Sequence, residues 1–345
     1  MVTTSTVPVI LDCDTGIDDS LALLYLLQHP SADLIAILST AGNVGVDVVT
    51  TNNLAWLEHC GRTDIEVCRG AEGPVVAELM TCEDTHGPHG VGYAELAAPA
   101  IQASDRTAAD AWIELTRSRP GELVGLVIGP MTNLALAIRK DPELPRRLRR
   151  LVIMGGTFNH PGNTTPTSEW NVAVDPDAAH EVLTAFGVDG APQPIVCSLG
   201  LTEQIAFTPD HLVRLAELAG SVPVERPSAR DDRGLRSSGS NKTVRLLTDA
   251  LRFYFEFHHD QGEGYLAHVH DPFAAAVALD PEIVRTRPAV VDVELTGSLT
   301  RGTTVADTRG FWGRPANALI ATSTDVPAFF DDLLGRLADL ARQLG

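Results

Sequence analysis

Short apolar runs alternate with longer helical patterns along most of this chain, and the alternation limits the folds it can adopt. Six runs predict buried strands, at 7–11, 34–40, 65–69, 123–128, 151–154 and 194–198. Helical patterns follow at 19–28, 48–59, 133–139 and 177–186, with a β-hairpin region at 292–308 and a last helix at 327–344. This order predicts an α/β fold, with an open, mostly parallel, Rossmann-like sheet and helices on both faces.

The chain has 345 residues, and α/β enzymes of that length often form one domain, so we expect a single domain over 1–345. One segment interrupts the alternation of strands and helices. Residues 221–243 are polar and rich in Ser, Arg and Gly. Such a composition predicts a polar loop or insertion on the surface, and a lid near a binding site is the alternative.

The charge balance limits the partners of the chain. It has 45 acidic against 26 basic side chains, a formal net charge of −19. This excess repels phosphate backbones and anionic lipids, so we expect neither nucleic acid nor a membrane as a partner. The five cysteines form no CxxC pair, and we see neither a signal-peptide pattern nor a membrane-length apolar run. These features predict a cytoplasmic protein that binds a neutral small molecule or a cation.

An acidic cluster follows the first predicted strand. Asp12, Asp14, Asp18 and Asp19 fall within eight residues. Burying unpaired carboxylates is costly, and a bound cation offsets that cost. Ligands that are all oxygen favour calcium or magnesium over zinc. Helix capping by Asp18 or Asp19 is the structural alternative, and it explains one or two of the four acids.

A magnesium-dependent phosphohydrolase of the DxDxT type is a second interpretation of this cluster. Asp12 and Asp14 match its two acids, but Thr15 comes one place early. That class also needs a later lysine for the phosphate. The two lysines of the chain, Lys140 and Lys242, do not follow strands in the expected way.

Further polar segments stand at predicted strand ends or late in the chain. They are 41–43 (AGN), 85–92 (THGPHGVG), 129–133 (GPMTN), 155–156 (GG), 162–163 (GN), 169–171 (EWN) and 268–272 (HVHDP). Ligands of open parallel sheets bind at the carboxyl ends of the strands, so these groups can converge. Together with DxDxGxDD at 12–19, and in this order, they resemble the inosine-uridine nucleoside hydrolase family from about 8 to about 307.

The resemblance implies the nucleoside hydrolase fold and a calcium-dependent hydrolysis of ribonucleosides to free base and ribose. It implies that calcium is bound by the side chains of Asp14, Asp19 and Asp271 and by the backbone carbonyl of Thr132. It implies substrate contacts from Asp18, Asn43, His86, Met154, Asn163, Glu169, Trp170 and Asn171. Asp14 is then the expected general base, and His270 the expected general acid for the departing base.

Two positions depart from many family members, with Thr15 in place of Pro and Trp170 in place of Phe. Trp170 bears on the shape of the pocket and hence on base preference. A histidine before Asp271 favours the broad or pyrimidine-tolerant branch over the purine-only branch. A non-catalytic nucleoside-binding protein remains an alternative, and the family implies a homodimer or homotetramer.

Three other histidines receive no role from this interpretation. His258, His259 and His268 are expected to be surface or loop residues. The aromatic residues between 253 and 265 could stack on the base, but an apolar helix face packed into the core is the commoner explanation.

Overall fold

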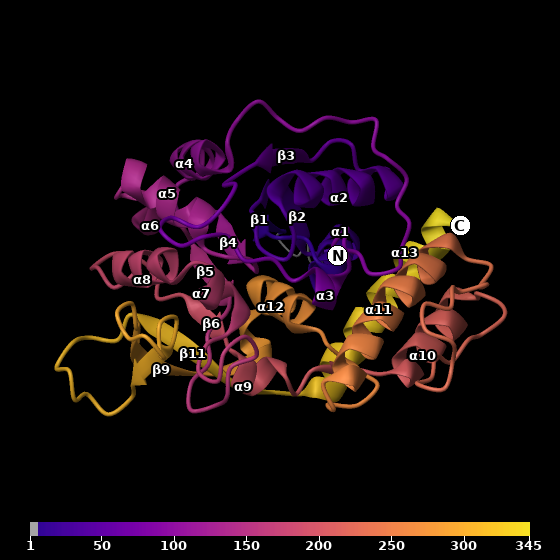
Figure 1. The fold of residues 1–345 in the computed structure, drawn as a ribbon. Coiled ribbons are helices and arrows are strands. Elements are labelled where there is room, and N and C mark those ends of the chain that lie inside the picture. The colour runs from indigo at the N-terminus through magenta and orange to yellow at the C-terminus, as the bar shows by residue number, and fades with distance from the viewer. Residues whose placement is uncertain (1–5) are drawn as a thin grey trace.

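The computed structural model describes residues 6–345 and has one large β-sheet through its middle (Figure 1). The strands of this sheet are β1 (Val7–Cys13), β2 (Ala32–Ser39), β3 (Glu66–Arg69), β4 (Val124–Val127), β5 (Arg150–Met154), β6 (Ile195–Cys197), β9 (Val284–Val293), β10 (Thr304–Asp307) and β11 (Ala318–Thr324). Two further strands, β7 (Ala206–Phe207) and β8 (Ala267–His268), pair with each other.

The nine strands lie in the order β10-β9-β11-β6-β5-β4-β1-β2-β3. Every neighbouring pair is parallel except β9 with β10 and β9 with β11. The predicted mostly parallel sheet is therefore confirmed, and the expected late hairpin is the β9–β10 pair at its edge.

Helices connect the parallel strands. They are α1 (Ile17–Gln28), α2 (Val46–His59), α3 (Glu83–His86), α4 (Ala108–Ser118), α5 (Thr132–Lys140), α6 (Leu144–Arg147), α7 (Trp170–Val174), α8 (Pro176–Ala185), α9 (Leu199–Thr202), α10 (Pro209–Ala219), α11 (Lys242–Asp260), α12 (His270–Leu279) and α13 (Val326–Leu344), with a 3-10 turn η1 (Pro281–Ile283). No helix within residues 6–345 is both long and apolar enough to cross a membrane.

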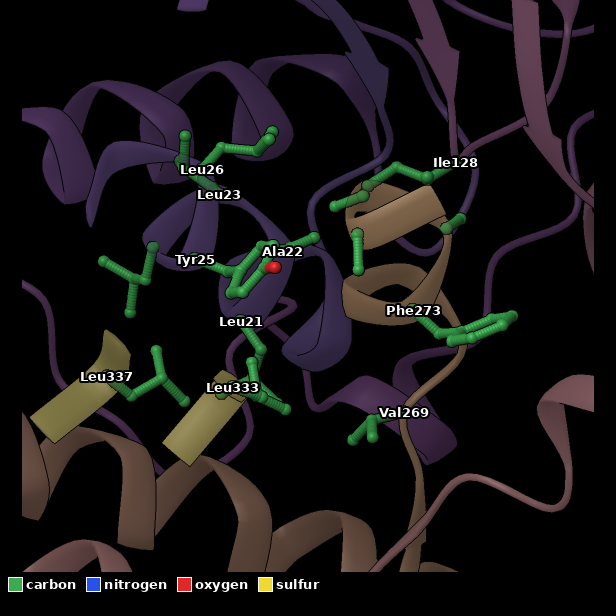
Figure 2. Close-up of a cluster of buried hydrophobic side chains, with 14 of the residues drawn as sticks. Leu21, Ala22, Leu23, Tyr25, Leu26, Ile128, Val269, Phe273, Leu333 and Leu337 are labelled. Carbon is green, nitrogen blue, oxygen red and sulfur yellow. The ribbon is translucent and has the colours of Figure 1, made fainter. Parts of the chain in front are cut away.

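The sheet separates two hydrophobic cores, because successive strand side chains point to opposite faces. On β1, Val9 and Leu11 join the core that contains α1, α12 and α13, whereas Ile10 joins the core that contains α4, α5 and α8. In Figure 2, Leu21 of α1 points toward Leu333 of α13 within the first core. Both faces of the sheet are thus covered by helices, as predicted.

The polar segment between α10 and α11 contains no helix or strand. Within it, Asp231 pairs with Arg252 of α11 at 2.8 Å, and the Ser237 N–H donates to Asp249 at 2.7 Å. These contacts hold the segment along α11, which packs with α10 and α13 at the right of Figure 1.

Candidate active site

A pocket of about 410 Å³ lies at the carboxyl ends of β1 and β5, next to α11. Most residues that the sequence predicts for the site line it together: Asp14, Asp18, Asn43, His86, Met154, Asn163, Glu169, Trp170, Asn171, His270 and Asp271. Asp19 and Thr132 are buried and do not line the pocket. The topology thus brings residues more than 250 positions apart to one cavity.

The turn after β1 fixes the first acids. The Asn43 N–H donates to Oδ2 of Asp14 at 2.8 Å, and the Gly16 N–H donates to Oδ2 of Asp19 at 2.8 Å. Gly42 lets the next loop approach, since a Cβ there would lie 2.1 Å from Oδ2 of Asp14. Any side chain at Gly42 would displace that carboxylate.

Asp12 does not join the other three acids. Its Oδ2 accepts from Nε1 of Trp112 at 2.7 Å and its Oδ1 from Nδ2 of Asn133 at 2.9 Å. Burial raises the pKa of Asp12 to about 7, and these two hydrogen bonds oppose that rise. Asp12 therefore ties β1 to α4 and α5, and the interpretation of all four acids as one cation cluster is wrong for this residue.

Asp18, Asp19 and Asp271 form a crowded, oxygen-only group, with Asp14 as a charged neighbour. One carboxylate oxygen from each of Asp18, Asp19 and Asp271 lies within 4.8 Å of the others. Burial raises the pKa of Asp18 to about 7 and that of Asp19 to about 6, and it raises those of Asp14 and Asp271 well above their usual values. Negative neighbours raise the pKa values of Asp14, Asp18 and Asp271 further, whereas backbone hydrogen bonds lower those of Asp14, Asp18 and Asp19.

Asp19 supplies the test of whether a metal fits. Its Oδ1 is buried and has no hydrogen-bond partner among the described residues. A buried carboxylate oxygen without a partner is costly, and a hard cation satisfies it. The donor set therefore fits an oxygen-preferring divalent ion. Thr132 is buried at the start of α5, and its hydroxyl donates to Asp175 at 2.7 Å.

Glu169 and Asn171 line the part of the pocket next to β5. Glu169 caps α7, and its oxygens accept the backbone N–H groups of Asn171 at 2.8 Å and Gly156 at 2.8 Å. Asn171 donates through Nδ2 to the carbonyl of Ile128 at 2.9 Å. Both side chains are buried and held in one orientation, which suits the recognition of hydroxyl groups.

Asn163 and Trp170 are less enclosed. Asn163 is exposed, and its Oδ1 accepts the backbone N–H of Trp170 at 3.0 Å. Trp170 lines the pocket, and its indole Nε1 is buried without a hydrogen-bond partner among the described residues.

Aromatic and histidine rings line the end of the pocket formed by α11 and α12. Nδ1 of His86 accepts the N–H of Ile17 at 3.1 Å, and its ring lies 5.2 Å from that of Tyr254. Burial lowers the pKa of His86 to about 3. Nδ1 of His270 shares a hydrogen bond of 2.8 Å with the hydroxyl of Thr202, a residue that carries no motif in the sequence.

Two of the three histidines expected at the surface or in loops also line this end. His258 of α11 is buried and His268 of β8 is half-buried, so the expectation was wrong for both, while His259 is exposed as expected. Tyr254 stands one helical turn before His258, and both line the pocket. The i,i+4 spacing could have revealed that they share a helix face.

Comparison with known proteins agrees with this arrangement. A family model described as inosine-uridine preferring nucleoside hydrolase matches residues 9–331. The chain belongs to this family. This nucleoside hydrolase is 33% identical over 331 residues to the pyrimidine-specific ribonucleoside hydrolase RihA of Salmonella newport, covering 96% of this chain and 98% of that protein. It is 32% identical over 338 residues to the inosine-uridine preferring nucleoside hydrolase of Crithidia fasciculata, with the same coverage.

Solved structures give the same result. The purine-preferring ribonucleoside hydrolase from Gardnerella vaginalis superposes with a TM-score of 0.86 at 28% identity, covering 97% of this chain and 99% of that one. The predicted family, the fold class and the reaction class, hydrolysis of ribonucleosides to base and ribose, are confirmed. The match contradicts the phosphohydrolase alternative, since it covers nearly the whole chain.

Proposed function

We propose that this nucleoside hydrolase uses calcium, bound by Asp14, Asp19 and Asp271 and by the backbone carbonyl of Thr132. The buried, unpartnered Oδ1 of Asp19, beside carboxylate oxygens of Asp18 and Asp271, carries this proposal. Bound calcium supplies an electrostatic anchor for the ribose hydroxyls and makes water more acidic. Asp18 lies within the same group of carboxylates, and we assign it to the ribose.

Asp14 is the proposed general base. The Asn43 N–H fixes one of its oxygens, so the carboxylate has a defined orientation at the pocket wall. Asp14 takes a proton from the attacking water while the oxygen of that water bonds to the anomeric carbon. The bond from this carbon to the base nitrogen breaks, and its electron pair stays with the base.

His270 is the proposed proton donor to the departing base. It is fixed by Thr202 through Nδ1, which leaves Nε2 for the pocket. A proton on the departing base neutralises the negative charge that the broken bond leaves there. Asn43, Asn163, Glu169 and Asn171 are assigned to the sugar hydroxyls, Met154 to the ribose pocket, and His86 and Trp170 to the wall around the substrate.

The pocket favours uncharged nucleosides over nucleotides. Among residues 6–345, no Lys or Arg lines it, whereas Asp14, Asp18, Asp84, Asp271, Glu169, Glu203 and Glu263 do. A phosphate group would meet this negative potential without a partner. We propose a broad or pyrimidine-tolerant base preference, supported by the histidine before Asp271.

The test is ribose release from inosine, uridine, cytidine and adenosine, with uridine 5′-monophosphate as the charged comparison. Chelation should abolish turnover and added calcium should restore it. The Asp14→Ala variant should lose at least about 100-fold in kcat, the lower end of what general acid–base catalysis contributes. Asp232→Ala is the matched control, because this aspartate is exposed and lies outside the pocket.

Two outcomes would contradict the proposal. Nucleoside binding without ribose release would support a non-catalytic binding protein. Turnover that survives chelation would remove the metal from the mechanism.

We also propose a homodimer or homotetramer of single-domain subunits. The family resemblance supports the assembly, and light scattering after gel filtration measures it. Phe311 is 75% exposed and Trp312 is 41% exposed just beyond β10, and such apolar surface often marks an interface. A cytoplasmic location stays a prediction, based on five cysteines that are all free.

A further inference from the structure

A second group of metal-ligand side chains lies in the same pocket, apart from the acidic cluster. His258, Glu263 and His268 each offer one ligand atom within 4.8 Å of the others, and all three line the pocket. None of them is needed for the calcium site or for the proposed hydrolysis. We propose that they form a second metal site, selective for a divalent transition-metal ion such as zinc.

A glycine-containing turn and a short strand pair bring these three residues together. His258 stands in the last turn of α11, and the Glu263 N–H donates to its carbonyl at 3.0 Å. Gly262 and Gly264 have φ angles of 82° and 106°, a conformation that favours glycine, and they turn Glu263 back over the end of the helix. His268 comes from β8, whose pairing with β7 fixes its position.

The hydrogen bonding of the two histidines is incomplete. Nδ1 of His258 lies 2.6 Å from Oε2 of Glu263, and Nε2 of His268 lies 3.7 Å from the same oxygen. The other ring nitrogens, Nε2 of His258 and Nδ1 of His268, are buried without a partner among the described residues. Burial lowers the pKa of both rings, that of His268 to about 4, which keeps them in the neutral form that binds metals.

The distances suit a small ion. Ligands at about 2.0–2.1 Å from a tetrahedral zinc lie about 3.3 Å from one another. From Oε2 of Glu263, Nδ1 of His258 lies at 2.6 Å, which is shorter than that value, and Nε2 of His268 lies at 3.7 Å, which is longer. Two histidines and one carboxylate also leave coordination positions open, an arrangement used by zinc and iron enzymes. On binding, His258 stays neutral: Nδ1 gives its lone pair to the ion, and the ring carries its one proton on Nε2 instead of sharing it with Glu263.

Ligand chemistry separates this site from the calcium site. The acidic cluster offers only oxygen atoms, whereas the His258–Glu263–His268 group offers two imidazole nitrogens, which zinc prefers. The ring of His268 lies 6.0 Å from that of His270. An ion held by this group would therefore place positive charge at the end of the pocket that we assign to the base. The competing explanation is a hydrogen-bonded pair that only closes the end of α11.

The experiment is calorimetric titration of the metal-free full chain with zinc chloride in the presence of excess calcium. We expect one zinc ion per chain that calcium does not displace. Loss of an outer partner alone typically costs about 10–100-fold in metal affinity, so His258→Gln and His268→Gln should each weaken binding by at least about tenfold. The control is His259→Gln, because this neighbouring side chain is exposed and does not line the pocket.

Two further measurements distinguish the loss of a metal ligand from a folding defect. Glu263 is half-exposed on a turn, so Glu263→Gln should fold normally and should also weaken zinc binding. Cobalt(II) gives a visible absorption spectrum that reports nitrogen ligation, and the histidine variants should alter it. Unchanged zinc affinity in all three variants, or displacement of the zinc by calcium, would overturn the proposal. Because these are binding measurements, their outcome does not depend on nucleoside turnover.

Discussion

Thr202 should control how well His270 protonates the departing base. Its side chain is fully buried at the end of α9, and its hydroxyl lies 2.8 Å from Nδ1 of His270 and 3.3 Å from the carbonyl of Ser198. The hydroxyl donates its one proton to the Ser198 carbonyl, so its oxygen accepts a hydrogen bond from Nδ1–H of His270. The protonated ring carries a proton on each nitrogen, so Thr202 holds Nδ1–H in place while Nε2–H is given to the departing base and the ring becomes neutral.

The perturbation is Thr202→Val, which keeps the shape and removes the hydroxyl. A buried neutral hydrogen bond contributes about 0.5–1.5 kcal/mol net, and a buried nitrogen left without a partner costs about 1–3 kcal/mol. If about 1.4 kcal/mol of this is lost from the transition state, kcat falls about tenfold. The remainder should appear as a lower free energy of unfolding.

The assay compares two leaving groups. Uridine needs a proton on its departing base, whereas p-nitrophenyl β-D-ribofuranoside releases a stable phenolate without one. Thr202→Val should therefore slow uridine hydrolysis about tenfold and leave the phenyl riboside almost unchanged. Thr202→Ser, which keeps the hydroxyl, should restore most of the rate on uridine.

A double-mutant cycle gives the decisive control. In a His270→Ala background, Thr202→Val should have no further effect on uridine hydrolysis, because the group that it orients is gone. Equal losses on both substrates, or an undiminished effect in that background, would refute the assigned role.

Three other predictions concern stability. Trp112→Phe removes the hydrogen bond to the buried carboxylate of Asp12 and should cost about 1.5–3 kcal/mol in denaturant unfolding, and a loss below about 0.5 kcal/mol would contradict it. Calcium at 100 times its Kd should raise the free energy of unfolding by about 2.7 kcal/mol, and Asp19→Asn should abolish most of that gain. Leu333→Ala in the core beside α1 should cost about 2–5 kcal/mol, whereas Leu299→Ala, at a side chain that is 88% exposed, should change stability by less than about 0.5 kcal/mol.

Much of the fold could be predicted because a parallel sheet covered on both faces leaves near-continuous apolar runs in the sequence. The runs at 7–11 and 151–154 correspond to β1 and β5. β11 was not predicted, although it lies between β6 and β9. Its C-terminal half is polar and partly exposed, and its place depends on pairing with a distant strand.

The residues of the site also divide into those that local sequence can place and those whose position depends on tertiary packing. Asp14, Asn43 and Asn171 could be found because they follow strands whose carboxyl ends meet at one edge. His258 and Tyr254 could not be placed in the same way, because their position depends on how α11 packs against the rest of the molecule. The role of Asp12 depends on Trp112, a hundred residues away, and local sequence does not identify that partner.

The distribution of charge in the pocket connects these results. A pocket lined by carboxylates, with no Lys or Arg among its described lining residues, attracts cations and repels anionic substrates. The donor atoms distinguish the two proposed sites, because the oxygen ligands around Asp19 suit the proposed calcium and the imidazoles around His258 suit the proposed transition-metal ion. An uncharged ribonucleoside is the substrate that enters such a pocket without an electrostatic cost, because its hydroxyls need polar partners but no counter-charge.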